Sequence, residues 1–457
     1  MNIAQILPGL EAVVATKPGK QKSKKCQSQY LWIPGDEPPE LGEHSLAKHR
    51  ILQSYLETYV AILATNPVVE KLNLSLVDGF SGGGAYRHPL TGEKISGSPL
   101  LMLESMKSAE VKANVGKTKQ FKLDADFYFI DRQKPTIEYL KKEINLCEAA
   151  YGRADKINIL RGRFTSHLDA VIKRIRSKGR ANRAIFLLDQ YGYTDVTLAN
   201  MRKIFRELPN AEVILTFAVD WLADFVNETG KFESALRNLE LSPKRDLLVQ
   251  IRKEHASDWR PTIQHVLHQH FFENSGADCY TPFFINSTES HRAYWLLHFS
   301  RHSTARNAMV DLHWRMQNHF QHFGKAGFEM LLGYDPKKSI ETPMLPFDFD
   351  ENAASLTHDS LLAEAPKRLS KFGKTISFHH FFKSVVNETP ATKDMIAAAL
   401  RQLSKDGEIE VFSKTRSQRR RGAILQDDNL LRLPATSTFL PLDAFMNKNT
   451  AENDTTK

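Results

Sequence analysis

The amino-acid sequence predicts a doubly wound, Rossmann-like α/β fold with a helical insertion, followed by a C-terminal winged-helix domain. Five short apolar runs recur at intervals typical of βα units, and helical patterns separate most of them, which favours a parallel sheet. Near the C-terminus, two helix starts and an Asp406-Gly407 turn lead into a strand and a basic hairpin. A chain of 457 residues is too long for one core, so two domains with tails are expected.

The predicted first domain covers residues 41–335 and follows an N-terminal tail of residues 1–40. Apolar residues recur at helical spacing over residues 44–65, which predicts an amphipathic helix before the first strand. Residues 218–285 are expected to form the helical insertion. The predicted strands are Leu74–Val77, Phe127–Ile130, Ile157–Leu160, Ile185–Leu188, Val213–Phe217 and Ala293–Phe299.

The proline-containing residues 336–370 predict a linker, residues 371–434 the winged-helix domain, and residues 435–457 a disordered tail. Within the second domain, helices are expected to begin at Ser377 and Thr392. The strands expected after them are Ile409–Phe412 and Ala423–Leu425.

The composition limits the compartment and the partner. A net charge of +9 favours a polyanionic partner, although it is spread over a long chain and also aids solubility. The three cysteines form no CxxC pair, which argues against disulfides, thiolate zinc sites and iron–sulfur clusters. With neither a secretory signal nor a run of about 20 apolar residues, the chain is expected in the cytoplasm and not in a membrane.

The first predicted strand ends in an acid that a glycine-rich turn follows, Asp78-Gly79-Phe80-Ser-Gly82-Gly83-Gly84. Glycines let backbone N–H groups approach a ligand. The order differs from the GxGxxG dinucleotide fingerprint and fits S-adenosylmethionine (SAM), whose zwitterionic amino acid end needs no pyrophosphate cradle. Tight packing of the turn is the alternative reading.

Two further acids follow predicted strands. Asp131 lies where the ribose of a nucleotide would pass, and a carboxylate there can accept hydrogen bonds from both ribose hydroxyls. Alternatively, Asp131 could cap a helix. Asp189 precedes Tyr191, an arrangement able to hold and stack an exocyclic amine of a base, or simply to cap a helix and pack. We expect all three acids to converge at the carboxyl edge of the sheet.

From residue 44 to about 435 the chain resembles the three-Cys-motif partner proteins (TcmP). The pieces that carry the resemblance are Lys48-His49-x-Ile51-Leu52, Asp78-Gly79-Phe80-x-Gly82-x-Gly84, Gly97-Ser98-Pro99, Asp189-x-Tyr191-Gly192 and Phe299-x-Arg301-His302. The resemblance implies a SAM-methyltransferase-like fold with a winged helix, a bacterial three-Cys-motif partner of a radical-SAM-like, phage-associated family, and a mobile-element or defence setting. Gln190 stands where that family usually has proline, which is expected to loosen the turn.

The region from residue 265 to 322 is rich in histidines, but no metal-site pattern stands out, and ordinary polar or core histidines are the favoured interpretation. His298 and His302, like His319 and His322, have spacings that could share a helical face. In the second domain, five cations between two predicted strands form a footprint for phosphates. They are Lys414, Arg416, Arg419, Arg420 and Arg421.

Two functions follow as hypotheses. The first is a SAM-dependent methyltransferase that acts on DNA or RNA, or on a substrate presented by a three-Cys-motif partner. Asp78, Gly79, Phe80, Gly82, Gly84 and Asp131 would then hold the cofactor, and Asp189 with Tyr191 the acceptor. The second is a non-catalytic adaptor whose basic winged helix recruits a partner to nucleic acid. Thr392, Lys393, Arg401 and Gln402 are expected to form an outward groove-reading face.

Overall fold

A computed structural model describes the chain from residue 30 to residue 434 with gaps. The described residues are 30–66, 68–179, 182–190, 195–217, 229–254, 259–286, 293–316 and 349–434. The predicted C-terminal tail of residues 435–457 and most of the predicted N-terminal tail lie outside them, as do Tyr191, Gly192, His319 and His322.

A mostly parallel seven-stranded sheet forms the first domain. Its order is β5-β4-β1-β6-β7-β9-β8, and β9 runs in the opposite direction to the other six strands. The strands are β1 (Lys71–Asp78), β4 (Lys122–Asp131), β5 (Ile157–Arg161), β6 (Arg183–Leu188), β7 (Ala211–Phe217), β8 (Cys279–Asn286) and β9 (Ala293–Ser300). All six predicted strands are present. β8 was not predicted, since its residues fell at the end of the expected helical insertion.

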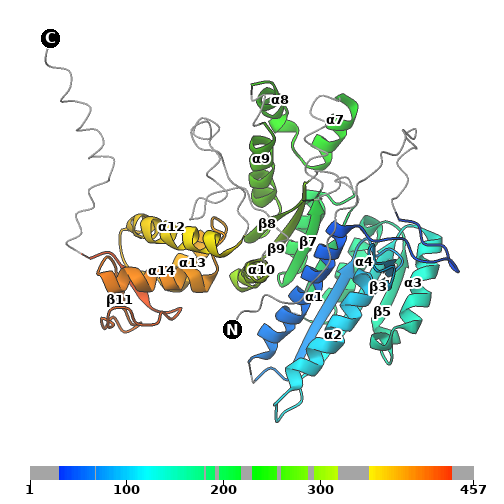
Figure 1. Cartoon of the computed structure of the whole chain (residues 1–457), viewed down its shortest axis with the longest axis horizontal. Coiled ribbons are helices and arrows are strands. Elements are labelled where there is room, and N and C mark those ends of the chain that lie inside the picture. Colours follow the sequence, from blue (N-terminus) through cyan, green and yellow to red (C-terminus); the bar gives the residue numbers. More distant parts are fainter. Residues whose placement is uncertain are drawn as a thin grey trace, which may run out of the picture.

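Helices cover both faces of this sheet (Figure 1). On one face lie α1 (Glu43–Ala64), α2 (Ser98–Asn114), α3 (Lys134–Leu146) and α10 (Ser303–Arg315). On the other lie α4 (Phe164–Arg176), α5 (Leu198–Glu207), α7 (Thr229–Asn238), α8 (Arg245–Glu254) and α9 (Trp259–Asn274). The central strands are apolar almost throughout, because side chains on both of their faces are buried; β4, for example, exposes only its ends.

Short elements connect these helices and strands. Between the glycine turn and α2, a hairpin of β2 (Ala85–Arg87) and β3 (Lys94–Ser96) fills the excursion expected after the first strand. Gly97 precedes α2, and its amide donates to the carbonyl of Gly84, which closes the base of the hairpin. Single-turn helices span Glu148–Ala150, Ala154–Lys156 and Ser242–Lys244.

The second domain combines three helices with a small antiparallel sheet of order β10-β12-β11. Its elements are α12 (Glu351–Ser370), β10 (Ile376–Ser377), α13 (Phe378–Val385), α14 (Lys393–Asp406), β11 (Glu410–Phe412) and β12 (Leu430–Arg432). Ser377 and Thr392 cap the helices that they were predicted to begin. The strand predicted at Ala423–Leu425 is wrong. After a single bridge between Phe412 and Gln418, the strand that pairs with β11 begins at Leu430, and Asn429 stabilises the loop before it by accepting the amide of Gln426.

Helix α12 lies within residues predicted as a linker and packs against α14 through buried apolar side chains that include Leu361, Ala365 and Leu369. The second domain contacts the first at the β8 edge of the large sheet (Figure 1). There the side chain of Asn387 accepts the amide of Tyr280 and donates to the carbonyl of Asp278. The two domains therefore share hydrogen bonds as well as apolar packing.

None of the described helices is long and apolar enough to cross a membrane.

Candidate functional site

The sheet order brings three acids together at its carboxyl edge. Strand β1 lies between β4 and β6, so Asp78, which ends β1, is aligned with Phe129 of β4 and Leu187 of β6. Asp131 ends β4 and Asp189 follows β6 directly. Neighbouring parallel strands thus end in acids on the same side of the molecule, as the positions of the predicted strands suggested.

Asp78 is completely buried. Its Oδ1 accepts the backbone amide of Phe80 at 3.1 Å, the Ser98 side chain also hydrogen-bonds to the carboxyl, and no cationic side chain among the described residues pairs with it. Burial raises the pKa of the Asp78 carboxyl to about 7, and the nearby carboxylates of Asp189 and Asp131 raise it further. A buried carboxylate without a counter-charge is costly, which points to a cationic group as its ligand.

The glycine turn is packed by protein atoms. A Cβ at Gly83 would lie 2.2 Å from the ring of Trp32, and one at Gly84 would lie 2.6 Å from Leu140. Gly82 also faces Trp32 and has a left-handed backbone with φ of 59°. Trp32 is fixed in place because its Nε1 donates to the carbonyl of Ala85 at 2.8 Å. Packing alone therefore accounts for glycine at Gly82, Gly83 and Gly84.

Several backbone amides of the turn are already engaged. The amide of Gly79 donates to the carbonyl of Leu187 at 2.9 Å, and that of Ser81 to the carbonyl of Ile130 at 3.0 Å. The turn thus leaves little of the open N–H cradle that a pyrophosphate requires. Phe80, half-buried, turns its ring toward Phe164 on the other face of the sheet.

Asp131 is partly exposed, and its Oδ1 accepts the amide of Gln133 at 2.8 Å. Burial raises the pKa of its carboxyl, while hydrogen bonds from the amides of Gln133 and Gly82 oppose that rise. The carboxylate therefore contacts the glycine turn and retains a path to solvent. Its bond to Gln133, just before α3, also fits the alternative reading as a helix-start residue.

Asp189 forms an ion pair with Lys48 of α1. Lys48 Nζ lies 2.8 Å from Oδ1 and 2.6 Å from Oδ2, so both carboxylate oxygens are bound. Burial alone would raise the pKa of Asp189, but the Lys48 charge and hydrogen bond hold it below its usual range. Lys48 lies in the Lys48-His49-x-Ile51-Leu52 motif, but no role was predicted for it, because no local pattern places α1 beside the end of β6.

His49 lies next to this ion pair. Burial and the Lys48 charge lower the pKa of its imidazole to about 4, so the ring is neutral near pH 7. Lys48, His49, Ser98, Asp189 and Thr216 line a cavity of about 20 Å³, which has room for a single water molecule. The sequence reasoning missed His49 and Thr216 as parts of this site.

An aromatic cluster lies beside His49. The ring of Tyr86 is 5.8 Å from that of His49 and 5.3 Å from those of Tyr30 and Trp32. Burial raises the pKa of the Tyr86 phenol well above its ordinary value, and the charges of Tyr30, Asp189, Asp78 and Asp131 add to this rise.

Gln190 stands where proline was expected, and the turn that it was expected to loosen, residues 191–194, lies outside the described residues. Gln190 itself is buried, and its Oε1 accepts the amides of Asp195 and Val196 at 3.2 and 3.1 Å. These bonds tie the end of β6 to the segment before α5. Tyr191, predicted to stack on the acceptor, lies outside the described residues.

The histidines do not assemble a metal site in the described part of the chain, where no group of three or more potential ligands occurs. His298 lies on β9, buried 3.0 Å from Glu212, whereas His302 caps α10 at the surface. The expectation that these two could share a helical face is therefore wrong, since the strand ends between them.

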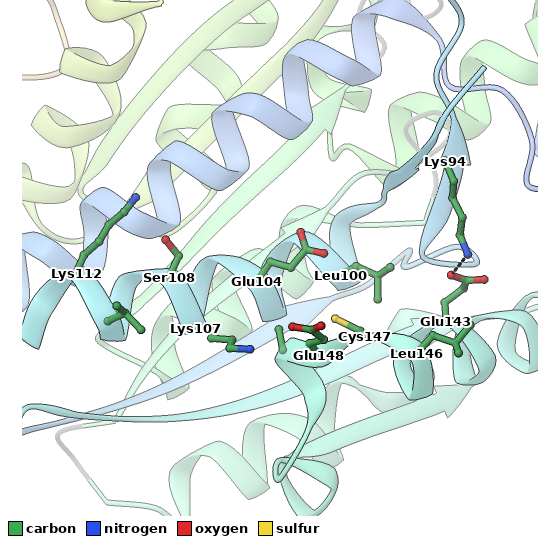
Figure 2. A pocket seen from close by; sticks show the side chains of 12 residues that line it. Lys94, Leu100, Glu104, Lys107, Ser108, Lys112, Glu143, Leu146, Cys147 and Glu148 are labelled. Atoms are coloured by element: carbon green, nitrogen blue, oxygen red, sulfur yellow. Dashed lines mark ion pairs between the residues drawn. The ribbon is translucent and has the colours of Figure 1, made fainter. Parts of the chain in front are cut away.

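A groove of about 700 Å³ lies elsewhere, between α2 and the end of α3 (Figure 2). An ion pair of 2.6 Å between Lys94 and Glu143 lies at one end, and Cys147 lines the groove. None of its lining residues is a strand-end acid, so this groove is separate from the site at the carboxyl edge.

The five predicted phosphate-binding cations divide into two kinds. Arg419 is half-buried and its Nη1 donates to Asn429 Oδ1 at 2.5 Å, so it stabilises the loop before β12. The others, Lys414, Arg416, Arg420 and Arg421, are exposed.

The groove-reading face predicted on α14 is wrong in its first half. Thr392 is buried as the helix cap, and Lys393 is engaged by Asp427 through its side chain and by Asn307 through its backbone. Gln402 is half-buried and donates to Asp406 on the same helix. Arg401 alone of the four is exposed, and its Nε donates to the carbonyl of Gly422.

Comparisons with known proteins bear on the second domain. Residues 333–416 match the family described as a GMT-like wHTH domain, a winged helix-turn-helix, and the match includes α12, α13, α14 and β11. A Legionella pneumophila protein of the DUF519 family model is 10% identical and covers 55% of this chain and 85% of its own, with a TM-score of 0.33, too low to indicate a shared fold. The curated proteins contain no match to the chain. The chain therefore carries a C-terminal winged-helix domain, a kind of domain suited to binding nucleic acid.

Proposed function

We propose that this protein is a SAM-dependent methyltransferase that acts on nucleic acid, with its cofactor site at the carboxyl edge of the sheet. The observation that carries the proposal is the fully buried Asp78 carboxylate, which has no cationic partner among the described residues and lies at the end of the central strand between Asp131 and Asp189. A buried carboxylate without a counter-charge suits a cationic ligand.

The strand order supports a nucleotide-binding fold. In order of appearance, the first five strands of the large sheet lie as 3-2-1-4-5, which is the order of doubly wound dinucleotide-binding proteins. Ligands of such sheets bind outside the carboxyl ends of the strands, where the order reverses. That position falls between β1 and β6, beside Asp78 and Asp189.

The described residues fit SAM better than a dinucleotide. The amides of Gly79 and Ser81 are engaged by backbone carbonyls, which disfavours a pyrophosphate at the turn. The Asp78 carboxylate would accept the cofactor ammonium group, and the partly exposed Asp131 would accept the ribose hydroxyls. When bound, SAM supplies an electrophilic methyl group.

The remaining residues would position the acceptor. Lys48 keeps Asp189 ionised, and His49 is neutral and thus available as a hydrogen-bond acceptor near pH 7. Tyr86, within the aromatic cluster, offers a ring beside these groups on which a base could stack. In this arrangement the protein contributes mainly orientation and exclusion of water.

The test is calorimetry with SAM and the full chain. We expect binding by the wild type and an affinity about 10- to 100-fold lower for Asp78→Asn, since a hydrogen bond to a charged group is lost. Asp155→Asn removes an exposed acid at the start of β5 and should bind as the wild type does. Absence of wild-type binding, or an unchanged Asp78→Asn affinity, would overturn the cofactor assignment.

One observation favours a second candidate, the non-catalytic adaptor. Both oxygens of Asp189 are bound by Lys48, so the acid expected to hold an acceptor amine is already occupied. An adaptor would use the winged helix to bring a partner, such as a three-Cys-motif protein, to nucleic acid. Transfer of a labelled methyl group from SAM to DNA or RNA would exclude the adaptor, and SAM binding without transfer to either would favour it.

A further inference from the structure

The turn between α13 and α14 is buried against the first domain. Arg306 of α10 is fully buried and donates hydrogen bonds to the backbone carbonyls of Ala391, at 3.1 Å, and Thr389. Trp314 Nε1 donates to the carbonyl of Pro390 at 2.8 Å, and Asn307 Oδ1 accepts the amide of Lys393. The residues that begin α14 are therefore held by α10.

This contact obstructs the usual way in which a helix-turn-helix reads bases. In that mode the N-terminal residues of the second helix enter the major groove and contact base edges. Here those residues are Thr392, buried, and Lys393, bound to Asp427 and Asn307. DNA could approach them only if the contact with α10 were broken.

The exposed stripe of α14 has its cations at the other end. Besides Asp406, whose carboxylate accepts hydrogen bonds from Gln402, the exposed positions of α14 are Asp394, Ala398, Arg401 and Lys405, spaced as one helical face. The first two are acidic and small, whereas the last two are cationic. The half of the stripe nearest α10 therefore repels phosphate or is neutral, and the half away from α10 attracts it.

The cationic end of α14 adjoins the hairpin. Arg401 Nε donates to the carbonyl of Gly422 at 2.7 Å, and Lys405 lies beside Gly422. The guanidinium of Arg421 lies against Gly407, directly after α14. The end of α14 and the chain that follows β11 thus present one basic surface, made of Arg401, Lys405, Lys414, Arg416, Arg420 and Arg421.

The tip of the hairpin is well defined by its own hydrogen bonds. The amide of Ser413 donates to the carbonyl of Ser417 at 2.8 Å, and that of Arg416 to the carbonyl of Ser413 at 2.9 Å. Arg416 has a left-handed backbone with φ of 63°, an unusual conformation for a residue other than glycine. Within the described chain, none of the six cations of the basic surface has an acidic group at ion-pair distance.

We infer that this winged helix binds the phosphate backbone of nucleic acid through the basic surface and does not read bases with the start of α14. The inference rests on the proposed function in taking nucleic acid as the partner, and it adds how that partner is held. Phosphate contacts fix position and carry no sequence information. Binding is therefore weakly dependent on sequence and strongly dependent on salt.

The test is fluorescence anisotropy of the full chain with labelled duplex DNA and single-stranded RNA of equal length, over a series of salt concentrations. We expect Lys405→Gln, Lys414→Gln, Arg420→Gln and Arg421→Gln combined to lower affinity about 100-fold at low salt. The slope of log affinity against log salt should fall by about 3 to 4 on duplex DNA, at roughly 0.9 per lost contact. The ratio of the affinities for DNA and RNA identifies the preferred nucleic acid.

A matched control removes the same charges elsewhere. Lys119→Gln, Lys122→Gln, Arg176→Gln and Arg206→Gln neutralise two lysines and two arginines that are exposed on the first domain. This variant should retain wild-type affinity within about threefold, because the four substitutions change the net charge of the protein but remove no contact with nucleic acid. An equal loss in both variants would overturn the inference.

A second variant tests the start of α14. Asp394→Asn should change neither affinity nor the ratio of affinities for duplexes of unrelated sequence, which we expect to stay within about threefold. Sequence-selective binding that Asp394→Asn alters would show that the start of α14 reads bases and would overturn the inference. If the wild type binds neither DNA nor RNA, the nucleic-acid partner in the proposed function fails as well, whereas unchanged binding by the combined variant refutes only the basic surface.

Discussion

Side chains of like charge cluster both at the carboxyl edge of the large sheet and on the basic surface of the winged helix, but the acids of the first are largely buried and the cations of the second are exposed. At the sheet edge, Asp78 is buried without a charged partner and its pKa rises to about 7, while Asp189 is compensated by Lys48. On the winged helix, six cations remain exposed to water with no acidic partner among the described residues. Buried charge alters protonation and stability, whereas exposed charge costs little and acts on other molecules.

The largest expected effect is that of Asp78→Asn on stability. The folded pKa of about 7 lies above the ordinary value of 3.8, so ionisation in the folded protein costs on the order of 4 kcal/mol. The asparagine keeps an acceptor for the Phe80 amide and cannot ionise. We therefore expect it to raise the free energy of unfolding at pH 8 by a few kcal/mol.

The pH dependence identifies the cause. A carboxyl with a raised folded pKa binds its proton more tightly in the folded state, so its stabilising contribution disappears as pH rises from about 4 to 7. The advantage of Asp78→Asn should grow over this window and vanish below it in urea titrations. His49, with its lowered pKa, makes the protein more stable as pH rises from about 4 to 6.5. Because His49 is present in both the wild type and the variant, its contribution cancels in the difference between their free energies of unfolding. A gain that does not vary with pH would contradict this explanation.

The next effect is that of Lys48→Met, which leaves Asp189 without its counter-charge. Removing one partner of a buried pair costs 3–5 kcal/mol, but the Asp189 side chain is 35% exposed, so we expect a loss of about 2 kcal/mol. Lys71→Met is the matched control, because Lys71 pairs with Asp124 at the surface and its loss should cost less than about 1 kcal/mol. Equal losses in thermal unfolding would mean that the Lys48 pair is no more buried than the control.

The smallest effect separates two neighbouring arginines of the hairpin. Arg419→Ala removes a hydrogen bond to Asn429 and should cost about 1 kcal/mol, with little change in the salt dependence of nucleic-acid binding. Arg420→Ala should change stability by less than about 0.5 kcal/mol and lower the salt slope by about 0.9. Denaturant unfolding and anisotropy on both variants check these assignments. A larger stability loss for Arg420→Ala, or a larger change in salt slope for Arg419→Ala, would contradict them.

Local patterns predicted much of this fold. The buried strands show as apolar runs, and the helix starts at Ser377 and Thr392 show as capping residues, because both signals depend only on neighbouring residues. Acids at strand ends could be predicted to converge because parallel strands share an edge. Strand β8 was missed, since its residues follow a long helix and include Pro282, which counts against a strand interior.

Contacts between distant segments could not be read from the sequence. Trp32 packs against the glycine turn, and Lys48 pairs with Asp189. The partners of each contact are far apart in the sequence, so no local pattern encodes them. The second strand of the hairpin was placed too early because the loop before it is longer than a tight turn. The buried start of α14 depends on α10, which lies on the other domain.

Arg306 also determines how the two domains fold. Its guanidinium is fully buried, and burial lowers its pKa to about 9, so it is stable inside the protein only when the carbonyls of Thr389 and Ala391 receive its hydrogen bonds. Those carbonyls take up their positions only after α13 and α14 have formed. We therefore expect the winged helix to fold before it docks, and docking to be a late, cooperative step. Domains that are separate in sequence would then unfold in a single transition.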